Sequence, residues 1–470
     1  MTQAPDRPRI DGSHALRVGL ACGPLFVCAV AACGARTEPV VDPLADASLP
    51  DSARDASTAS ARCAPARVPD FNGDGLGDFA LVTSPSIAVY YGARGRIPTT
   101  PTTFLPRPAT LTVDATIVSS VGDLDGDGTS ELAIYRRSAQ TSPDLPGSPF
   151  RAGTLYIARG SRAGLDPRSL TLVDAPPGFE DNFPDDVRFA GRIADTTRAA
   201  FVVTLTQGRG AFVYVRASDG RYASQTTVPV GLDASGDATD LFVHGAGDLD
   251  GDGFDDLAAA TDREASRIAG GASGVWGPSR QSLYTDIGNR VGPYFDGVGD
   301  VTRDGCADAM LLSFAGGGSF RVFAGGVGFG TAAAWAPRAS HGRPIAVNGT
   351  TDFIPVGDAD GDGTDDVLVF GTCLSGAPCT GGTYERLLYR GAPSGLAEAA
   401  VALPALSTQR TSLRALGDLD GDGRHELGEL TSGSTSLVIW RGTLSGYVVT
   451  ARTTVTRPDV AGRSFTGATP

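Results

Sequence analysis

The stretch GDLDGDGTSELAIY, from Gly122 to Tyr135, places three aspartates, Asp123, Asp125 and Asp127, at every second position. Carboxylates this close together repel one another strongly unless a cation lies among them. Gly128 follows the third aspartate, and glycine readily adopts the positive φ of a sharp turn. The apolar residues after it are typical of a β-strand. The stretch therefore predicts a tight acidic turn that joins two strands.

This acidic turn recurs at intervals of about 50 to 70 residues, which is the signature of a repeat architecture. The recognisable copies begin at Asp70, Asp123, Asp248, Asp300, Asp358 and Asp418. The interval after Asp123 is about twice the others, and a degenerate copy, GRIADTTRAAFVV from Gly191, fills it. In this copy Arg192, Ala194 and Thr196 replace the acids, but the apolar strand is kept. The chain therefore contains seven units.

Each acidic turn precedes an apolar run, and a second run later in the unit ends near glycines, as in LYIARGSRAG and VIWRGTLSG. One or two further short runs complete the unit, and helical periodicity is nearly absent. Four strands per unit, repeated seven times, predict an all-β fold: a seven-bladed β-propeller with four antiparallel strands per blade. A sandwich or a barrel is the alternative architecture, but neither needs seven copies of one turn.

The GDxxGDGxxD turn, the strand after it and the later aromatic-x-x-G turn resemble the FG-GAP / VCBS repeats of integrin α-subunit propellers and their bacterial relatives. The resemblance covers residues 64–470, although the FG and GAP tags themselves are poorly kept. It implies a propeller that binds calcium in its acidic turns. It also implies two kinds of function, because such propellers serve in adhesion and also occur in some polysaccharide lyases and phospholipases.

Oxygen chemistry favours calcium in the nine-residue turn, which we number from its first aspartate. Side chains at positions 1, 3, 5 and 9 and the carbonyl at position 7 supply the hard ligands that calcium prefers, whereas magnesium demands stricter geometry and transition metals favour His or Cys. A solvated turn without an ion is the alternative. We expect about six structural Ca²⁺ sites, and the Asp300 turn departs most from the pattern. The expected ligands are Asp70, Asn72, Asp74, Leu76, Asp78, Asp123, Asp125, Asp127, Thr129, Glu131, Asp248, Asp250, Asp252, Phe254, Asp256, Asp300, Thr302, Asp304, Cys306, Asp308, Asp358, Asp360, Asp362, Thr364, Asp366, Asp418, Asp420, Asp422, Arg424 and Glu426.

An EF-hand also begins DxDxDG, but it requires a glutamate at position 12 of its loop. Of the six intact turns, only the last has one there, Glu429, and the other five have apolar residues. The EF-hand interpretation therefore fails as a rule. We interpret Glu429 as a strand residue on the solvent face.

The first residues are typical of an export signal. Arginines precede an uncharged stretch from Val18 to Cys33 that is too short to span a bilayer comfortably. Because it ends in Val-Ala-Ala-Cys, similar to a bacterial lipobox, we predict a lipoprotein signal peptide over residues 1–32, lipidation of Cys33 and a disordered tether over residues 33–63. An ordinary secretory signal is the alternative. The protein is then exported and held at the outer membrane or cell surface, touching the membrane only through this lipid.

Four further cysteines remain after such processing, and an even number in an exported chain suggests disulfides. Cys373 and Cys379 flank a short loop and form the expected pair. Cys63 with Cys306 is the second possible pair. Neither spacing is that of a zinc site.

Binding, rather than catalysis, is the expected function. The formal charge of −14 argues against nucleic acid as a partner. The three later histidines lie in no nucleophile motif: His425 is in an acidic turn and should be exposed, His244 is on an apolar strand and should be a satisfied core residue, and His341 is in a loop. We expect a monomeric, non-enzymatic module for a protein or glycan ligand, with a polysaccharide lyase as the alternative. The candidate contacts lie in a long loop on the face opposite the acidic turns: Phe179, Glu180, Asp181, Phe183, Asp185 and Asp186.

Overall fold

A computed structural model describes residues 69–456 of the protein, except 85, 113–114, 141–149, 195–196, 206–209, 229–240, 262–263, 272–279, 286–290, 314–318, 331–350, 373, 375–383, 398, 404–410, 432–435 and 449. The expected signal peptide (1–32), the lipidated Cys33 and the tether (33–63) lie outside these residues. Among the residues that are described, no helix is long and apolar enough to cross a membrane.

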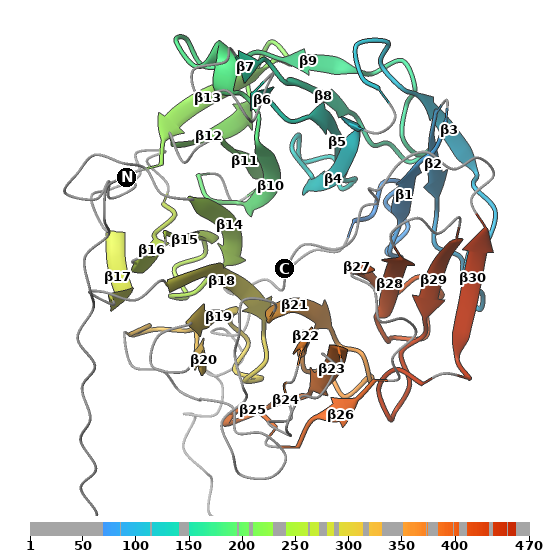
Figure 1. The fold of residues 1–470 in the computed structure, drawn as a ribbon, viewed down its shortest axis with the longest axis vertical. Coiled ribbons are helices and arrows are strands. Elements are labelled where there is room, and N and C mark those ends of the chain that lie inside the picture. Colours follow the sequence, from blue (N-terminus) through green and yellow to red (C-terminus); the bar gives the residue numbers. More distant parts are fainter. Residues whose placement is uncertain are drawn as a thin grey trace, which may run out of the picture. The chain divides into compact units, whose positions relative to one another are not determined.

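The described strands form seven antiparallel sheets of three or four strands each, grouped around a common centre (Figure 1). The first four sheets consist of β1 (Phe79–Val82), β2 (Ser86–Tyr90) and β3 (Thr103–Pro106); β4 (Ile117–Gly122), β5 (Glu131–Arg136), β8 (Thr154–Ala158) and β9 (Thr171–Val173); β10 (Asp186–Gly191), β11 (Ala200–Thr204), β12 (Ala211–Arg216) and β13 (Tyr222–Thr227); and β14 (Phe242–Gly247), β15 (Asp256–Ala260), β16 (Glu264–Ile268) and β17 (Arg280–Thr285).

The remaining three sheets follow in chain order. They consist of β18 (Val291–Gly299), β19 (Asp308–Ser313) and β20 (Ser319–Phe323); β21 (Asp352–Gly357), β22 (Asp366–Thr372), β23 (Tyr384–Tyr389) and β26 (Val401–Ala402); and β27 (Thr411–Gly417), β28 (Glu426–Thr431), β29 (Ser436–Trp440) and β30 (Arg452–Thr456). The connections contain two short hairpins and a 3₁₀ turn: β6 (Ala139–Gln140) with β7 (Phe150–Arg151), β24 (Gly391–Ala392) with β25 (Gly395–Leu396), and η3 (Glu180–Asn182).

Each sheet is one blade of a seven-bladed propeller with four antiparallel strands per blade, which confirms the predicted fold. Five blades have all four strands within the described residues, and the first and fifth have three. In the second to seventh blades, the strand that precedes the turn is the innermost, and successive innermost strands contact one another from β4 to β27. The degenerate copy from Gly191 forms the complete blade β10–β13, so it is a full member of the ring.

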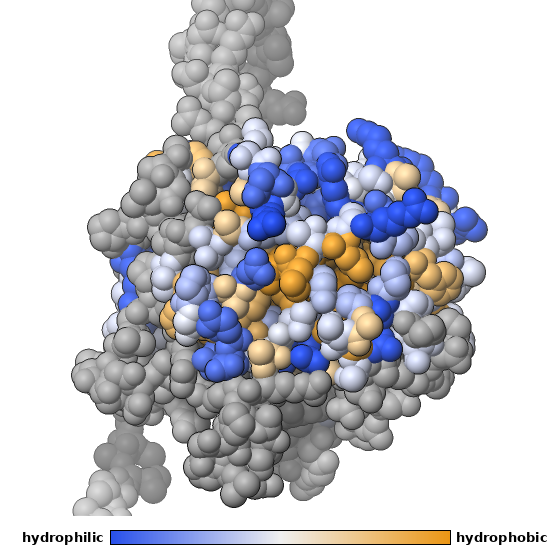
Figure 2. Space-filling model, turned by 90° about the horizontal axis from the view of Figure 1, so that it is seen from above, coloured by the Kyte–Doolittle hydropathy of each residue, from blue (hydrophilic) through white to orange (hydrophobic). Residues whose placement is uncertain are grey.

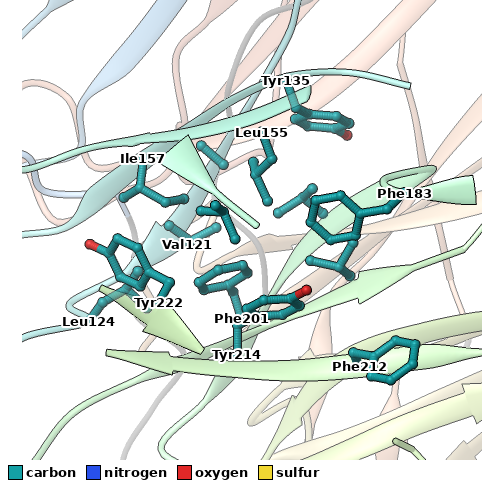
Figure 3. Packing of buried hydrophobic residues seen from close by; sticks show 14 of the residues in the cluster. Val121, Leu124, Tyr135, Leu155, Ile157, Phe183, Phe201, Phe212, Tyr214 and Tyr222 are labelled. Carbon is teal, nitrogen blue, oxygen red and sulfur yellow. The ribbon is translucent and has the colours of Figure 1, made fainter. Parts of the chain in front are cut away.

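The hydrophobic core lies between neighbouring blades. In Figure 3, Val121 and Leu155 of the second blade pack against Phe201 and Tyr214 of the third. The Phe201 and Tyr214 rings stack with their centroids 5.2 Å apart. A sheet that is covered on both faces needs apolar side chains at consecutive positions. Strands β11 and β19 are accordingly buried along their whole length, which explains the continuous apolar runs in the sequence.

The outermost strands are covered less completely. Strands β3, β9 and β30 contain exposed or half-buried residues at most positions. Figure 2 shows the molecule from above relative to Figure 1, and on the face seen there an apolar area lies between hydrophilic ones. Phe104 of β3 and Leu172 of β9 are more than half exposed. Single exposed apolar residues of this kind are ordinary on protein surfaces and need no partner.

Backbone hydrogen bonds join each acidic turn to the next blade. The N–H at position 8 of one turn donates to the carbonyl at position 1 of the turn before it, as Asp365 does to Asp300 at 3.1 Å. We call these the junction bonds. The other pairs of this kind are Gly77–Asp418, Ser130–Asp70, Ala199–Asp123, Asp255–Arg192 and His425–Asp358. A second kind of bond, to the position-2 carbonyl, occurs at four of these junctions, and among the described residues it is the bond that joins the fourth and fifth blades, from Gly326 N to Leu249 O at 3.0 Å. The Gly77–Asp418 pair joins the first blade to the last and closes the ring.

The close approach at each junction explains the glycine before position 1. Gly299 has a φ of +75°, and a Cβ there would collide with Asp365 of the next blade. In the same way, His425 lies directly over Gly357. His425 is therefore half-buried at a blade junction. The prediction that His425 is a solvent-exposed side chain was wrong, because a single unit of the sequence does not show which residues the neighbouring blade covers.

Glu429 in β28 lies in the core, so the interpretation of it as a solvent-facing residue was also wrong. It is 1% exposed. Its carboxylate accepts hydrogen bonds from both terminal nitrogens of Arg386 in the preceding blade, at 2.9 and 2.6 Å, and from Trp440 Nε1 at 3.0 Å. A buried charge is tolerated when it is paired and hydrogen-bonded in this way.

Replacing Arg386 with methionine should leave Glu429 buried without a cationic partner. Breaking a buried ion pair on one side typically costs about 3–5 kcal/mol, so we expect a clearly lower urea midpoint, measured by circular dichroism. The double variant Arg386→Met/Glu429→Leu removes both charges and should recover most of this loss. Equal midpoints for the wild type and Arg386→Met would show that the pair contributes nothing.

Candidate metal centres in the acidic turns

The carboxylate at position 1 shapes each intact turn. In the second blade, Asp123 Oδ1 accepts the N–H groups of Gly126 at 2.7 Å and Asp127 at 3.1 Å, and its Oδ2 accepts that of Gly128 at 2.9 Å. The same three bonds form around Asp70, Asp248, Asp358 and Asp418. At Asp300, two of the three form. The backbone therefore curls around this carboxylate, as the sequence pattern predicts.

The glycine at position 6 has a positive φ in every intact turn, which confirms the reason given for its presence. Position 4 also has a positive φ wherever it is glycine. In the fifth blade, Arg303 occupies position 4 with a φ of +59°. This conformation is strained for a side chain with a Cβ. The Asp300 turn thus keeps the shape of the others at a cost that they do not have.

The acid at position 9 is buried and binds two backbone N–H groups. Asp366 accepts Ala359 N, at position 2 of its own turn, at 3.1 Å and Gly391 N, in a later turn of the same blade, at 3.0 Å. Three other turns repeat both bonds through Asp78, Glu131 and Asp256. Asp308 instead accepts the N–H at position 3, from Thr302 at 2.8 Å, together with Gly325 N at 2.7 Å. Glu426 makes the first bond, to Leu419 N at 2.7 Å, and its Oε1 is buried without a hydrogen-bond partner among the described residues. Sequence reasoning assigned these acids as ligands only and missed that they join two turns of the blade.

Burial raises the pKa of every position-9 carboxyl. Removal from water is the largest cause, and the other acids of the turn add to it, while the backbone N–H donors act in the opposite direction. The pKa is raised to about 7 for Asp256 and Asp308, about 8 for Asp78, Glu131 and Asp366, and about 9 for Glu426. A positive charge within the turn would favour the ionised forms.

In the second blade, one carboxylate oxygen of the position-3 aspartate pairs with arginine, and the other is buried in the turn. Asp125 Oδ2 pairs with Arg159 Nε at 2.7 Å and with an Arg216 terminal nitrogen at 2.8 Å. Its Oδ1 is buried and has no hydrogen-bond partner among the described residues. A buried acceptor without a donor is costly, so this oxygen is available to a cation.

In two further turns, one oxygen of the position-3 aspartate also pairs with an arginine and the other has no donor among the described residues. Asp250 pairs with Arg267, and Asp420 pairs with Arg441. In both aspartates, Oδ1 is buried and lacks a hydrogen-bond partner within the described part of the chain. The arginines had not been identified from the sequence. Their signal was present, because Arg159 and Arg441 stand directly before Gly160 and Gly442, at the end of the second apolar run of their units.

Four turns bring three acids together, each with a carboxylate oxygen within 4.8 Å of the others. These groups are Asp123, Asp125 and Asp127; Asp248, Asp250 and Asp256; Asp358, Asp360 and Asp366; and Asp418, Asp420 and Glu426. Clustered hard oxygens, some of them without donors, are the ligand set that calcium prefers. The residues of these four turns therefore fit a calcium ion.

The turns that begin at Asp70 and Asp300 form no such group. Each has a neutral residue at position 3 that bonds to an acid of the same turn. Asn72 Nδ2 donates to Asp74 Oδ2 at 2.9 Å, and Thr302 Oγ1 donates to Asp308 Oδ1 at 3.3 Å. These two turns fit a cation less well than the other four do.

The candidate ligand contacts separate into buried and exposed residues. Phe183 is 3% exposed and packs against Tyr214 with ring centroids 5.9 Å apart. Phe179 is half-buried and packs edge-on against Phe212 at 5.2 Å. Both aromatic rings belong to the core between the second and third blades, so Phe183 is not accessible to a ligand. The pattern of aromatic and acidic residues in this loop did not reveal that its rings point inward.

The acids of this loop are placed differently. Glu180 and Asp181 lie in η3 and are exposed. Asp185 is half-buried at the start of the next blade, where its N–H donates to Thr204 O at 2.9 Å. Asp186 pairs with Arg188, as described below. The exposed contact candidates in this loop are therefore the two acids of η3.

Cys306 forms a disulfide. The other cysteines, including Cys63, Cys373 and Cys379, lie outside the described residues, as does His341. The predicted pair Cys373–Cys379 stays a prediction. His244 has the expected partner, Asp296 Oδ2 at 2.7 Å. It is half-buried, however, so the prediction that it lies in the core was wrong.

No protein-family model and no curated protein matches the chain. Several solved structures are similar to it. A functionally unknown protein from Desulfotomaculum acetoxidans has a TM-score of 0.46 and 14% identity over 84% of this chain and 99% of that one. The rhamnogalacturonan lyase YesW has a TM-score of 0.42 and 16% identity, with 83% and 73% covered. A Bacillus licheniformis rhamnogalacturonan lyase has a TM-score of 0.39 and 16% identity, with 86% and 73% covered. These values describe a general likeness of fold alone.

The position-9 acids should make the metal-free protein less stable as the pH rises. Their carboxyls have a pKa of about 7 to 9 when folded, against about 4 when unfolded. The stability that this difference supplies is complete below pH 4, declines as the unfolded state releases its protons, and is lost once the pH passes the folded pKa. After divalent ions are removed on a chelating resin, we expect a lower Tm at pH 8.5 than at pH 6 by calorimetry. A Tm that rises across this range would contradict the assignment.

Proposed function

We propose that this protein is a calcium-stabilised propeller of the bacterial cell envelope that acts as a non-enzymatic binding module. Its units are then FG-GAP / VCBS repeats, and Cys33 carries the lipid that anchors the exported chain. One observation carries the calcium assignment. The buried Oδ1 atoms of Asp125, Asp250 and Asp420 have no donors within the described part of the chain, although each lies in a turn with further acids.

In this proposal the acids at positions 1, 3, 5 and 9 and the carbonyl at position 7 hold the ion. The ion supplies positive charge that offsets carboxylate repulsion and cross-links the two strands on either side of the turn. The arginine on the other oxygen of position 3 leaves Oδ1 directed away from that ion pair. Since the same turns supply the junction bonds, a bound ion stabilises the attachment of one blade to the next.

The binding role is supported by the connections on the face opposite the acidic turns. Antiparallel strands alternate in direction, so the connection that precedes β10 lies on that opposite face. There, η3 presents Glu180 and Asp181 to solvent on a rigid blade. Exposed charged residues held by a rigid scaffold are suited to recognition of a protein or glycan.

A glycan and surface-protein array, probed with the full-length chain in calcium, tests this function. We expect binding that is at least ten-fold weaker in the double variant Glu180→Gln/Asp181→Asn, because the loss of these charges removes contacts at the proposed surface. The matched control Asp166→Asn/Asp219→Asn removes two exposed acids from turns on the other face and should bind as the wild type does. Absence of any ligand on the array would contradict a binding module. Cleavage of an acidic polysaccharide would also contradict it and would favour a lyase.

A further inference from the structure

A second group of charged residues lies around the propeller axis, on the innermost strands that lead into the acidic turns. Alternate residues of the innermost strands are half-buried, and those between them are buried, so the half-buried ones face the axis. The third residue before each strand-ending glycine occupies one level: Ser119, Arg188, His244, Asp296, Ile354 and Arg414. Two residues earlier, the next level contains Ile117, Asp186, Phe242, Tyr294, Asp352 and Ser412. We call the charged members and the histidine of both levels, Asp186, Arg188, His244, Asp296, Asp352 and Arg414, the axial cluster.

Two pairs within the axial cluster are formed by direct hydrogen bonds. Arg188 Nε donates to Asp186 Oδ2 at 2.8 Å, and Tyr135 Oη donates to the other oxygen of Asp186 at 2.7 Å. His244 Nδ1 and Asp296 Oδ2 are 2.7 Å apart and join the fourth blade to the fifth. The side chains of these two pairs are 17% to 29% exposed, so solvent and small solutes reach them.

Arg414 of the seventh blade has no carboxylate partner among the described residues. Its guanidinium donates one hydrogen bond to a described residue, to the carbonyl of Leu413 at 2.9 Å. Burial lowers the pKa of Arg414, and the like charge of Arg188 lowers it further, whereas Asp186 and Asp352 act in the opposite direction. Arg188 and Arg414 thus face the axis at the same level from different blades, and their like charges repel each other.

Asp352 does not fully offset this positive charge. Its one hydrogen bond to a described residue is from Phe353 N at 2.8 Å. Burial raises the pKa of Asp352 to about 7, so at neutral pH it is ionised in only part of the molecules. Asp186 and Asp296 already have direct partners, so among the described residues Arg414 has N–H groups without an acceptor, at the level of a second cation.

We propose that the axial cluster binds a small oxyanion, such as a carboxylate, phosphate or sulfate group, between Arg188 and Arg414. A guanidinium presents N–H groups in a planar fork that matches two oxygens of such an anion. The anion relieves the repulsion between the two arginines and gives Arg414 the acceptor that the described residues do not supply. None of these groups belongs to an acidic turn, so the site is independent of the calcium proposal and of the η3 surface.

Calorimetric titration of the full-length chain with inorganic phosphate, sulfate and D-glucuronate tests this site and distinguishes inorganic from organic anions. We expect saturable binding of at least one of them at millimolar or lower concentration. Arg188→Gln and Arg414→Gln should each weaken it at least ten-fold. Asp352→Asn should strengthen it several-fold, because it removes a negative charge that competes with the ligand.

The control Arg221→Gln removes an exposed arginine from the β12–β13 turn and should leave the affinity unchanged. Near-ultraviolet circular dichroism establishes that each variant is folded. If an arginine variant does not fold, the increase in affinity of Asp352→Asn decides the question. The proposal is overturned if the wild type binds none of the three anions, if both folded arginine variants bind as the wild type does, or if Asp352→Asn binds no more tightly.

Discussion

The hydrogen bond from position 8 of one acidic turn to position 1 of the turn before it is the interaction on which the ring depends. Among the described residues it recurs at six of the seven blade junctions, and the seventh keeps only the bond to the position-2 carbonyl of Leu249. A propeller blade exposes apolar surface on both faces, so it is stable only when its neighbours are held in register. The acidic turn provides that register, because its position-1 carboxylate fixes the backbone that accepts the bond.

The third blade shows that a turn can make the junction bonds without the full set of acidic residues. Its turn has Arg192 at position 1, where the six others have aspartate, and Ala194 at position 3, where four of them have aspartate, yet it makes the same junction bonds. There the N–H of Arg192 also donates to a carboxylate oxygen of Asp255, at 2.6 Å. A junction therefore forms without the cluster of acids. The acids of the other turns are therefore not required for the junction bond, and we propose that they bind a cation through carboxylate oxygens that have no donors among the described residues.

The sequence was sufficient to predict the fold because the repeat is local: each unit shows its own turn and strands, and counting the units gives the number of blades. Burial between blades was not predictable, since it arises from residues one unit apart. Glu429, His425 and Phe183 were each placed near solvent, and each lies against a neighbouring blade. The axial cluster was also missed, although alignment of the units on the glycine before position 1 would have placed Arg188, His244, Asp296 and Arg414 at one level.

The central claim is that cations in the acidic turns stabilise the ring. Its most direct test is the melting midpoint of the protein with millimolar calcium and after complete chelation, at one pH and ionic strength. Four sites, each at a hundred times its Kd, would contribute about 2.7 kcal/mol each to the folded state. The account predicts a fall of many degrees on chelation that is reversed by added calcium. The same midpoint in both conditions would contradict it.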